Sequence, residues 1–480
     1  MFSDNWFSLF ALAIVALAYV GIRALDKRNF NWNLLLVISL VAGFAVGALF
    51  GDSGIIARYV FHDPGVLSGA AEPTIFQNNL QYVSLIGDIY VNLNEALVAP
   101  IILLAILSAV MSLNSSKKLK TLGSRSLFWL LLNTAISIVI SIAVCAFLGI
   151  GKGVPLSIGG LDASKYQNIN TKFTDVIEGF FPHNFFKELS ENRIVPIIIT
   201  ALALAIAFIS FDKNDRTEPF RKGVEALKDV VFKIVGFVVD LIPYAILALA
   251  ADVADTAAGR LNILSALLVV IVVIIILCLF QTFVVTGLFV RLAAGVSPIR
   301  FFKKLTQALM AGAATQSTIA ALPTTIKCLV TKIGVKEEIG NFTATLGSTV
   351  GMPGCAGIWP TVLAIFAINF LGIQYSIEQY IILGLIAFSV SFGTAGVAGT
   401  AVITATAVFT TAGLPLEVFV LLFPISFIVG MFRTPTNVSC AAAAATIVAR
   451  QTGAFDEDIF YDRVSPQEEP QQNEVALSHE

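Results

Sequence analysis

One arginine interrupts an apolar segment that is long enough to cross a membrane. Arg433 lies in the sequence GMFRTPTNVSC, with apolar residues for two helical turns before it and a run of alanines after it. A guanidinium at the middle of a membrane costs roughly 3 kcal/mol or more, so such residues are functional candidates. Its planar fork matches a carboxylate through two parallel hydrogen bonds. We therefore expect Arg433 to hold a substrate carboxylate.

Two neighbours of this arginine share its helix face. Gly430, Arg433 and Asn437 have the spacing i, i+3 and i+7, which places them on one stripe of an α-helix. The alternative is a structural arginine that snorkels or pairs with an acid such as Asp240. No acid lies near Arg433 within its own helix, which favours substrate binding. Asp240 and Glu95 are themselves either satisfied structural groups or members of a proton relay.

Three stretches rich in small residues interrupt the apolar sequence of the second half. They are residues 311–323 (AGAATQSTIAALP), 347–360 (GSTVGMPGCAGIWP) and 391–400 (SFGTAGVAGT). In lipid, a backbone that leaves the helix is tolerated only inside protein or around a cavity. Small residues also occur where membrane helices simply pack. Three stretches in succession, two of them with Ser or Thr at the tip, favour a binding site.

The first and third stretches predict re-entrant helical hairpins. Their apolar flanks are roughly a dozen residues long, and a full crossing needs about 20 residues. Lysines on both sides place the first hairpin at the cytoplasmic face, and the third stretch opens outward. Hairpins from opposite faces indicate an inverted repeat with a binding site near the middle of the membrane. The second stretch predicts a break within a spanning helix.

The composition predicts an all-α polytopic membrane protein. Apolar residues make up 57% of the 480 residues and charged residues 13%, which is more apolar surface than a soluble domain can bury. Apolar runs of about 20 residues recur along the chain, and we expect about nine spanning helices. The net charge of −2 gives no basic field to attract nucleic acid.

The distribution of charge predicts the orientation of the chain. Lysines and arginines cluster in residues 23–28, 117–125 and 213–228, which the positive-inside rule assigns to the cytoplasm. The first apolar segment lacks a preceding basic residue and a clean cleavage motif, so we expect a retained helix instead of a signal peptide. After Arg450 the composition becomes acidic and rich in Pro and Gln, which predicts a disordered cytoplasmic tail over residues 454–480.

The sequence shows no machinery for catalysis. A P-loop, an HExxH motif, a Rossmann glycine pattern and a Ser-His-Asp arrangement are all missing from any usable context. The five cysteines lie in apolar sequence without a CxxC pair, so neither a disulfide framework nor a zinc site is predicted. We expect a transporter that is not an enzyme and that has no cofactor.

The order of these features resembles the dicarboxylate/amino acid:cation symporter family, which has the fold of the glutamate transporter homologues. The resemblance covers nearly the whole chain. It rests on a Ser-containing tip that ends in Leu-Pro, a broken helix, the tip GTAGVAG, and RTxxNV in the last helix. The segment GxxGCAGIWP (residues 351–360), the AGVAG tip and the extra N-terminal helix are most similar to the bacterial L-cystine symporter branch.

The resemblance implies an elevator-type homotrimer in the bacterial cytoplasmic membrane, with a cytoplasmic C-terminus. Residues 1–30 would form the extra helix, and residues 31–255 mainly the fixed scaffold with part of the transport domain. Residues 256–453 would form the moving transport domain, with the two hairpin tips as gates. The implied partners are a small carboxylate substrate, membrane lipid and a coupling cation, either a proton or sodium.

The resemblance also implies a substrate site between the two tips, the broken helix and the last helix. The candidate substrate-binding residues are Ser317, Thr318, Gly354, Cys355, Gly393, Thr394, Ala395, Gly396, Gly399, Gly430, Arg433, Thr434 and Asn437. The candidate ligands of a coupling cation are Gly351 and Asn437. No other metal site is expected.

Three positions depart from the family pattern. Members that carry amino acids have an Asp one turn before the arginine, where this chain has Gly430. Sodium-coupled members have an Asn-Met-Asp-Gly-Thr motif in the broken helix and an acid four residues after the last-helix Asn. This chain has Pro353 and Ala441 in place of those two acids. Because hard cations prefer oxygen ligands, we expect sodium dependence to be weak or absent.

The predicted function is secondary-active symport of a small carboxylate-bearing solute, with L-cystine or a related amino acid as the first candidate. The alternatives are transport of a dicarboxylate or another organic anion, and exchange without sodium coupling. A sensor or scaffold that does not transport is disfavoured by the intact tips. An anion channel would differ by carrying currents without saturable uptake.

Overall fold

The computed structural model describes residues 6–28, 32–50, 75–111, 117–154, 178–179, 181–211, 218–257, 261–393, 396 and 399–463. Its principal helices in the first half are α1 (Trp6–Lys27), α2 (Trp32–Phe50), α5 (Ile75–Met111), α6 (Lys117–Leu148), α9 (Phe185–Ser190), α10 (Ile194–Phe211), α11 (Glu218–Val239) and α12 (Ile242–Ala257). Within these ranges the chain is helical and forms no strand beyond one isolated bridge. The prediction of an all-α chain is confirmed.

The second half consists of shorter helical segments. In chain order they are α13 (Leu261–Phe280), η2 (Gln281–Thr286), α14 (Gly287–Phe289), η3 (Val290–Ala294), α15 (Pro298–Thr315), α16 (Leu322–Cys328), η4 (Leu329–Ile333), α17 (Glu337–Gly347), η5 (Pro353–Ile358), α18 (Trp359–Phe370), α19 (Ile377–Val390), η6 (Ser391–Gly393), α20 (Thr400–Thr411), α21 (Leu416–Leu422), η7 (Phe423–Ile425), α22 (Ser426–Gln451) and α23 (Glu457–Phe460).

Five helical stretches of the described chain are long and apolar enough to cross a membrane. They are Leu85–Ser108, Thr121–Leu148, Ser265–Ala294, Pro353–Phe370 and Leu416–Gln451. A sixth arises if α11 and α12, which meet at a bend of 47°, form one span. The chain is therefore polytopic, and a total of about nine spans stays a prediction based on length.

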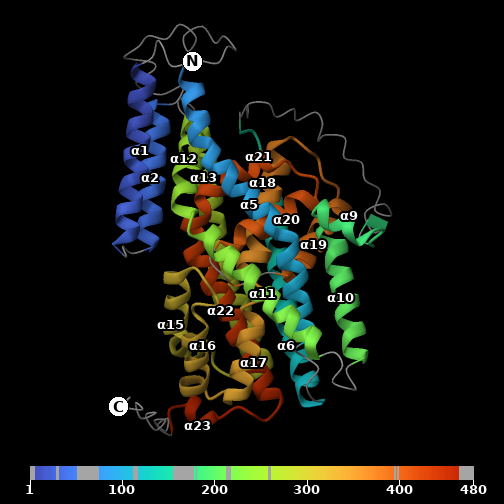
Figure 1. Ribbon diagram of the computed structural model, residues 1–480. Helices are drawn as coiled ribbons and strands as arrows, with labels where there is room; N and C mark the ends of the chain where they lie inside the picture. Colours follow the sequence, from blue (N-terminus) through green and yellow to red (C-terminus); the bar gives the residue numbers. More distant parts are fainter. Residues whose placement is uncertain are drawn as a thin grey trace, which may run out of the picture.

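Helices of the first half pack closely through small residues. α2 lies along α12, and both helices contact α5. A Cβ at Gly43 would collide with Leu247 O, and one at Gly47 would collide with Ala251 O. The two backbones can approach this closely only because these positions lack side chains. Figure 1 shows α1 and α2 together at one side of the molecule.

Two helical hairpins enter the molecule from opposite ends. α15 turns back through residues 316–321 into α16, and α19 packs against α20, the next helix after the second tip. Figure 1 shows the first pair in the lower half and the second pair in the upper half, with α22 between them. The predicted pair of opposed hairpins is confirmed. The predicted break in a helix is confirmed as well, because residues 348–352 separate α17 from η5 and α18.

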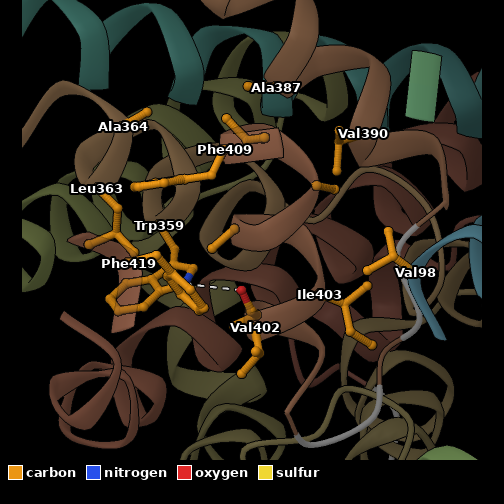
Figure 2. Packing of buried hydrophobic residues seen from close by; sticks show 14 of the residues in the cluster. Val98, Trp359, Leu363, Ala364, Ala387, Val390, Val402, Ile403, Phe409 and Phe419 are labelled. Carbon is orange, nitrogen blue, oxygen red and sulfur yellow. Dashed lines mark hydrogen bonds between the residues drawn. The ribbon is translucent and has the colours of Figure 1, made fainter. Parts of the chain in front are cut away.

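α18 lies at the centre of the apolar core. Its residues from Trp359 to Asn369 are all buried, as expected for a helix that is hydrophobic all round. Figure 2 shows Trp359 and Leu363 among side chains of neighbouring helices, including Phe409 of α20 and Phe419 of α21. The second hairpin is therefore anchored on the half-helix that follows the break.

The segment after α22 is folded as far as Arg463, so the prediction of a disordered tail is wrong for its first part. Val335 and Phe455 form an antiparallel bridge, and α23 follows directly. Phe460 is fully buried, because aromatic residues among the acids pack under the first hairpin. We call residues 452–463 the C-terminal clasp. The rest of the predicted tail, residues 464–480, lies outside the described residues.

Lys304 ties the C-terminal clasp to the first hairpin. Its Nζ donates to the carbonyl oxygens of Lys332 and Ile459, at 2.8 and 2.9 Å, and to Asp462 Oδ1 at 2.6 Å. The hydrogen bond from Lys304 lowers the pKa of the Asp462 carboxyl group. The ionised Asp462 carboxylate therefore stabilises the fold. This contribution is complete at pH values above the ordinary pKa of Asp, including neutral pH, and is lost as the pH falls through the lowered pKa.

Replacing Phe460 with Ala should destabilise this end of the protein. Removing a fully buried Phe side chain costs about 3–5 kcal/mol, so we expect a lower midpoint of thermal unfolding for the purified protein in detergent. Arg463→Ala is the control, because that side chain is 63% exposed. An unchanged midpoint for the Phe460 variant would show that the C-terminal clasp does not stabilise the fold.

Candidate functional site

The two hairpin tips contact each other at one carbonyl oxygen. Gly396 O in the second tip accepts from Ser317 Oγ at 2.8 Å and from the N–H of Ile319 at 3.0 Å. Thr318 Oγ1 lies 3.2 Å from the same oxygen and 3.2 Å from Ser348 O in the broken helix. The tips and the break thus close on one another in this structure.

Two glycines permit this close approach. A Cβ at Gly396 would collide with Thr318 Oγ1 and Ser348 O. Gly399 precedes α20 with a φ of +85°, a conformation that L side chains rarely adopt. A Cβ there would also lie 3.3 Å from a side-chain carbon of Val239, so the second tip rests against the bend between α11 and α12.

Asn437 fastens the broken helix to α22. Its Oδ1 accepts from the N–H groups of Gly354 and Cys355 at 2.8 and 3.4 Å, and its Nδ2 donates to Cys355 Sγ at 3.1 Å. A side-chain oxygen at the first N–H groups of a helix acts as an N-terminal cap. A Cβ at Gly354 would collide with Arg433 O. The half-helix that carries Trp359 is therefore fixed relative to Arg433.

Arg433 is buried, with 3% of its surface exposed, and only one of its nitrogens is bonded. Nη2 donates to Ser426 O at 2.7 Å and to Ser426 Oγ at 3.0 Å. The guanidinium carbon lies 4.3 Å from the centroid of the Trp359 ring, a cation–π contact. Throughout the described chain, Nε and Nη1 have no hydrogen-bond partner and no acid pairs with the guanidinium. Buried donors without partners are costly, which favours a ligand.

The two acids considered for a structural or relay role lie elsewhere. Asp240 is exposed at the bend between α11 and α12. Glu95 is half-buried on α5, where its carbonyl oxygen accepts from Asn192 Nδ2 at 3.3 Å. Neither acid lines the pocket beside Arg433. The structure therefore does not contain the alternative pairing of Arg433 with Asp240.

A pocket of about 340 Å³, including the solvent at its opening, lies beside Arg433. It is lined by both tips, the broken helix, α20 and α22, through Gln316, Cys355, Gly399, Ala401, Val402, Ser426, Phe427, Gly430, Arg433 and Thr434. In this closed arrangement the enclosed part of the pocket holds little more than one water molecule. None of these residues is acidic. The lining that the structure describes thus carries the charge of a single guanidinium.

The predicted substrate residues fall into three groups that touch one another. The residues of the contact between the tips are Ser317, Thr318 and Gly396, those of the helix cap are Gly354, Cys355 and Asn437, and those of the pocket include Cys355, Gly399, Gly430, Arg433 and Thr434. Gly393 ends the turn η6, whose Ser391 O accepts from the N–H of Gly351 at 3.1 Å. The predicted residues Thr394 and Ala395 lie outside the described residues.

Sequence reasoning missed two residues that hold the guanidinium. Ser426 lies seven residues before Arg433, and this spacing places it on the same helix stripe, so the pattern could have found it. Trp359 belongs to the GIWP sequence, but no local pattern connects it with Arg433. Its Nε1 donates to Ala401 O at 3.0 Å, the dashed line in Figure 2, and this bond fixes the ring.

The predicted cation ligands are engaged by the protein. Asn437 Oδ1 already accepts two N–H groups. Gly351 O lies 3.9 Å from Cys440 Sγ. A Cβ at Gly347 would lie only 2.7 Å from the Cβ of Ala441, so close helix packing fills the place of the missing acid. Within the described part of the chain, no group of His, Cys, Asp or Glu side chains could hold a metal ion.

Known proteins are similar to this chain over most of its length. The model of the sodium:dicarboxylate symporter family matches residues 33–451. An uncharacterized symporter of Haemophilus influenzae is 31% identical over 421 residues, which cover 85% of this chain and 92% of that protein. The L-cystine uptake protein TcyP of Bacillus cereus is 29% identical over 465 residues, covering 93% and 95% of the two chains. TcyP of Shouchella clausii is 26% identical over 474 residues, covering 96% and 97%.

Replacing Gly396 with Val should hold the two tips apart. Forcing extra carbons into a packed site costs about 1–3 kcal/mol, so we expect uptake in proteoliposomes to fall by about 10-fold while the protein stays folded. Gly236→Val is the matched control, because a Cβ there meets nothing within 4 Å. Normal uptake by the Gly396 variant would mean that the contact between the tips is not a gate.

Proposed function

Because this chain belongs to the sodium:dicarboxylate symporter family, we propose that it moves a small carboxylate-bearing solute by secondary-active transport with an elevator mechanism. The protein is an integral membrane transporter of a bacterial cell membrane and not an enzyme. One observation supports a carboxylate on the solute. Nε and Nη1 of the buried Arg433 have no protein partner among the described residues, and Arg433 lines a pocket next to the hairpin tips. Each of these two N–H groups can donate to a carboxylate oxygen in a charge-assisted hydrogen bond.

The packing of the helices supports a division into two bodies. α2, α10, α11 and α12 all contact α5, and these five helices would form the scaffold. The first hairpin, the broken helix and α6 contact α22, and the second hairpin contacts α18 and α6; together these elements would form the transport domain. Opening of the second tip would admit substrate from outside, and its contact with Ser317 and Thr318 at Gly396 O would close the site. We propose that the protein works as a homotrimer with a cytoplasmic C-terminus.

The relatives and the pocket favour different substrates. L-cystine or a related amino acid is the first candidate, because two of the relatives are L-cystine uptake proteins. A dicarboxylate or another organic anion is the second candidate. The pocket itself supports the second, because position 430 has no carboxylate to receive an ammonium group and no lining residue is acidic.

Replacing Arg433 with Ala should weaken substrate binding strongly. Loss of a buried, hydrogen-bonded charge pair costs about 2–5 kcal/mol, so binding should weaken by at least about 30-fold. Arg433→Lys keeps the charge but loses the planar guanidinium, so its substrate affinity should lie between those of the wild type and Arg433→Ala. Uptake of labelled cystine and succinate measures this. Arg450→Ala, at the far end of the same helix, is the control. Intact uptake by Arg433→Ala would rule out the proposed role.

Transport should not require sodium. Ala441 packs against Gly347, and Pro353 offers only a carbonyl oxygen, which accepts from Ser137 Oγ at 3.4 Å. Without carboxylates at these positions, a hard cation would find neutral and already engaged oxygens. We expect proteoliposomes to accumulate solute under a proton gradient or by exchange, and equally with or without sodium. Strong accumulation that depends on sodium alone would contradict this.

A further inference from the structure

Gln316 occupies the space in which the missing carboxylate would lie. Gly430 is one helical turn before Arg433, and both residues line the pocket. A Cβ at position 430 would collide with Gln316 Oε1 and would lie 2.9 Å from Gln316 Cδ. The side-chain amide of the first hairpin tip therefore lies directly against the backbone of α22. Gln316 was not among the residues predicted for the site.

The amide is held in this position from two sides. Gln316 follows the last residue of α15 and has a φ of +50°, which is uncommon for a residue other than glycine. Its Nε2 donates to Phe427 O at 3.2 Å. These two constraints direct Oε1 toward Gly430. An acceptor without charge thus lies beside Gly430, one helical turn before the guanidinium.

The exchange of a carboxylate for an amide changes the charge of the pocket. A Cβ at position 430 would lie 3.6 Å from Arg433 Nη2, so a carboxylate there would neutralise the guanidinium. With Gly430 and Gln316 the positive charge remains unbalanced. A substrate ammonium group would lose its water next to a like charge and gain only a neutral acceptor. A carboxylate gains from the same unbalanced charge.

We propose that Gln316 is the specificity-determining residue of this transporter, and that with Gly430 it selects carboxylates that lack an ammonium group. The inference rests on the proposed function and deepens it. The substrate carboxylate accepts from one of the two unpartnered groups of Arg433, Nε or Nη1. Gln316 Oε1 accepts from a neutral donor of the substrate, such as a hydroxyl group.

Matched ligands test this selectivity on the wild-type protein. Cystine and 3,3′-dithiodipropionate differ only by ammonium groups, as do aspartate and succinate. We expect the amine-free member of each pair to bind at least about 10-fold more tightly. The measurements are inhibition of uptake and thermal stabilisation of the purified protein. Tighter binding of cystine or aspartate would overturn the inference.

Substitution of Gln316 tests the residue itself. Gln316→Glu replaces the amide with a carboxylate of the same size, and should raise the relative affinity for the ammonium-bearing ligands by about 10-fold. The double variant Gln316→Gly with Gly430→Asp removes the side chain with which a Cβ at position 430 would collide and places an acid there. It should shift the ratio of affinities in the same direction. Gln307→Glu is the matched control, because Gln307 is exposed on the same helix and contacts Lys332. The control should keep the wild-type ratio.

The outcomes separate this inference from the proposed function. If no carboxylate binds the wild-type protein and Arg433→Ala changes nothing, the proposed function fails. If the wild-type protein binds both members of each pair equally, the role of Gln316 fails and the proposed function stands. The same holds if Gln316→Glu and the double variant both fold and keep the wild-type ratio of affinities. If the variants do not fold, the ligand pairs on the wild-type protein decide.

Discussion

A guanidinium buried in an apolar core needs groups that compensate its lost water, and the protein supplies Arg433 with only part of them, all without charge. Its own helix supplies Ser426, two turns earlier. The broken helix supplies the ring of Trp359. Each partner stabilises the charge only if it is held at a fixed distance, because dipoles and ring faces act at short range. The surrounding structure can be understood as the means of holding them.

The hydrogen bonds of the broken helix provide that rigidity. Asn437 caps the half-helix that begins at Gly354, and Trp359 follows on the same half-helix. Trp359 Nε1 then donates to Ala401 O at the start of α20, directly after the second tip. A continuous chain of contacts thus connects α22, the cation–π contact and the hairpin that would open to the outside. A shift of that hairpin would change the surroundings of Arg433.

The sequence predicted what depends on local pattern. Hairpin tips and the helix break leave runs of small residues that membrane sequence otherwise avoids, and the helical period groups Gly430, Arg433 and Asn437. The bond from Ser317 to Gly396 joins residues 79 positions apart, which no local pattern specifies. The C-terminal clasp was missed because its average composition is acidic, whereas Phe460 is buried only through a surface formed by the first hairpin.

The three lost acids have one consequence in common. Helix packing fills the place of an acid at Ala441, a carbonyl oxygen is all that Pro353 offers, and the amide of Gln316 lies beside Gly430. None of these groups carries a negative charge. The empty site therefore keeps an uncompensated guanidinium, whereas the site with a bound carboxylate is neutral. Since a buried unpaired charge is costly, the proposed elevator mechanism predicts that the loaded site reorients more readily than the empty one. A carrier with this asymmetry favours exchange of one carboxylate for another over net uptake.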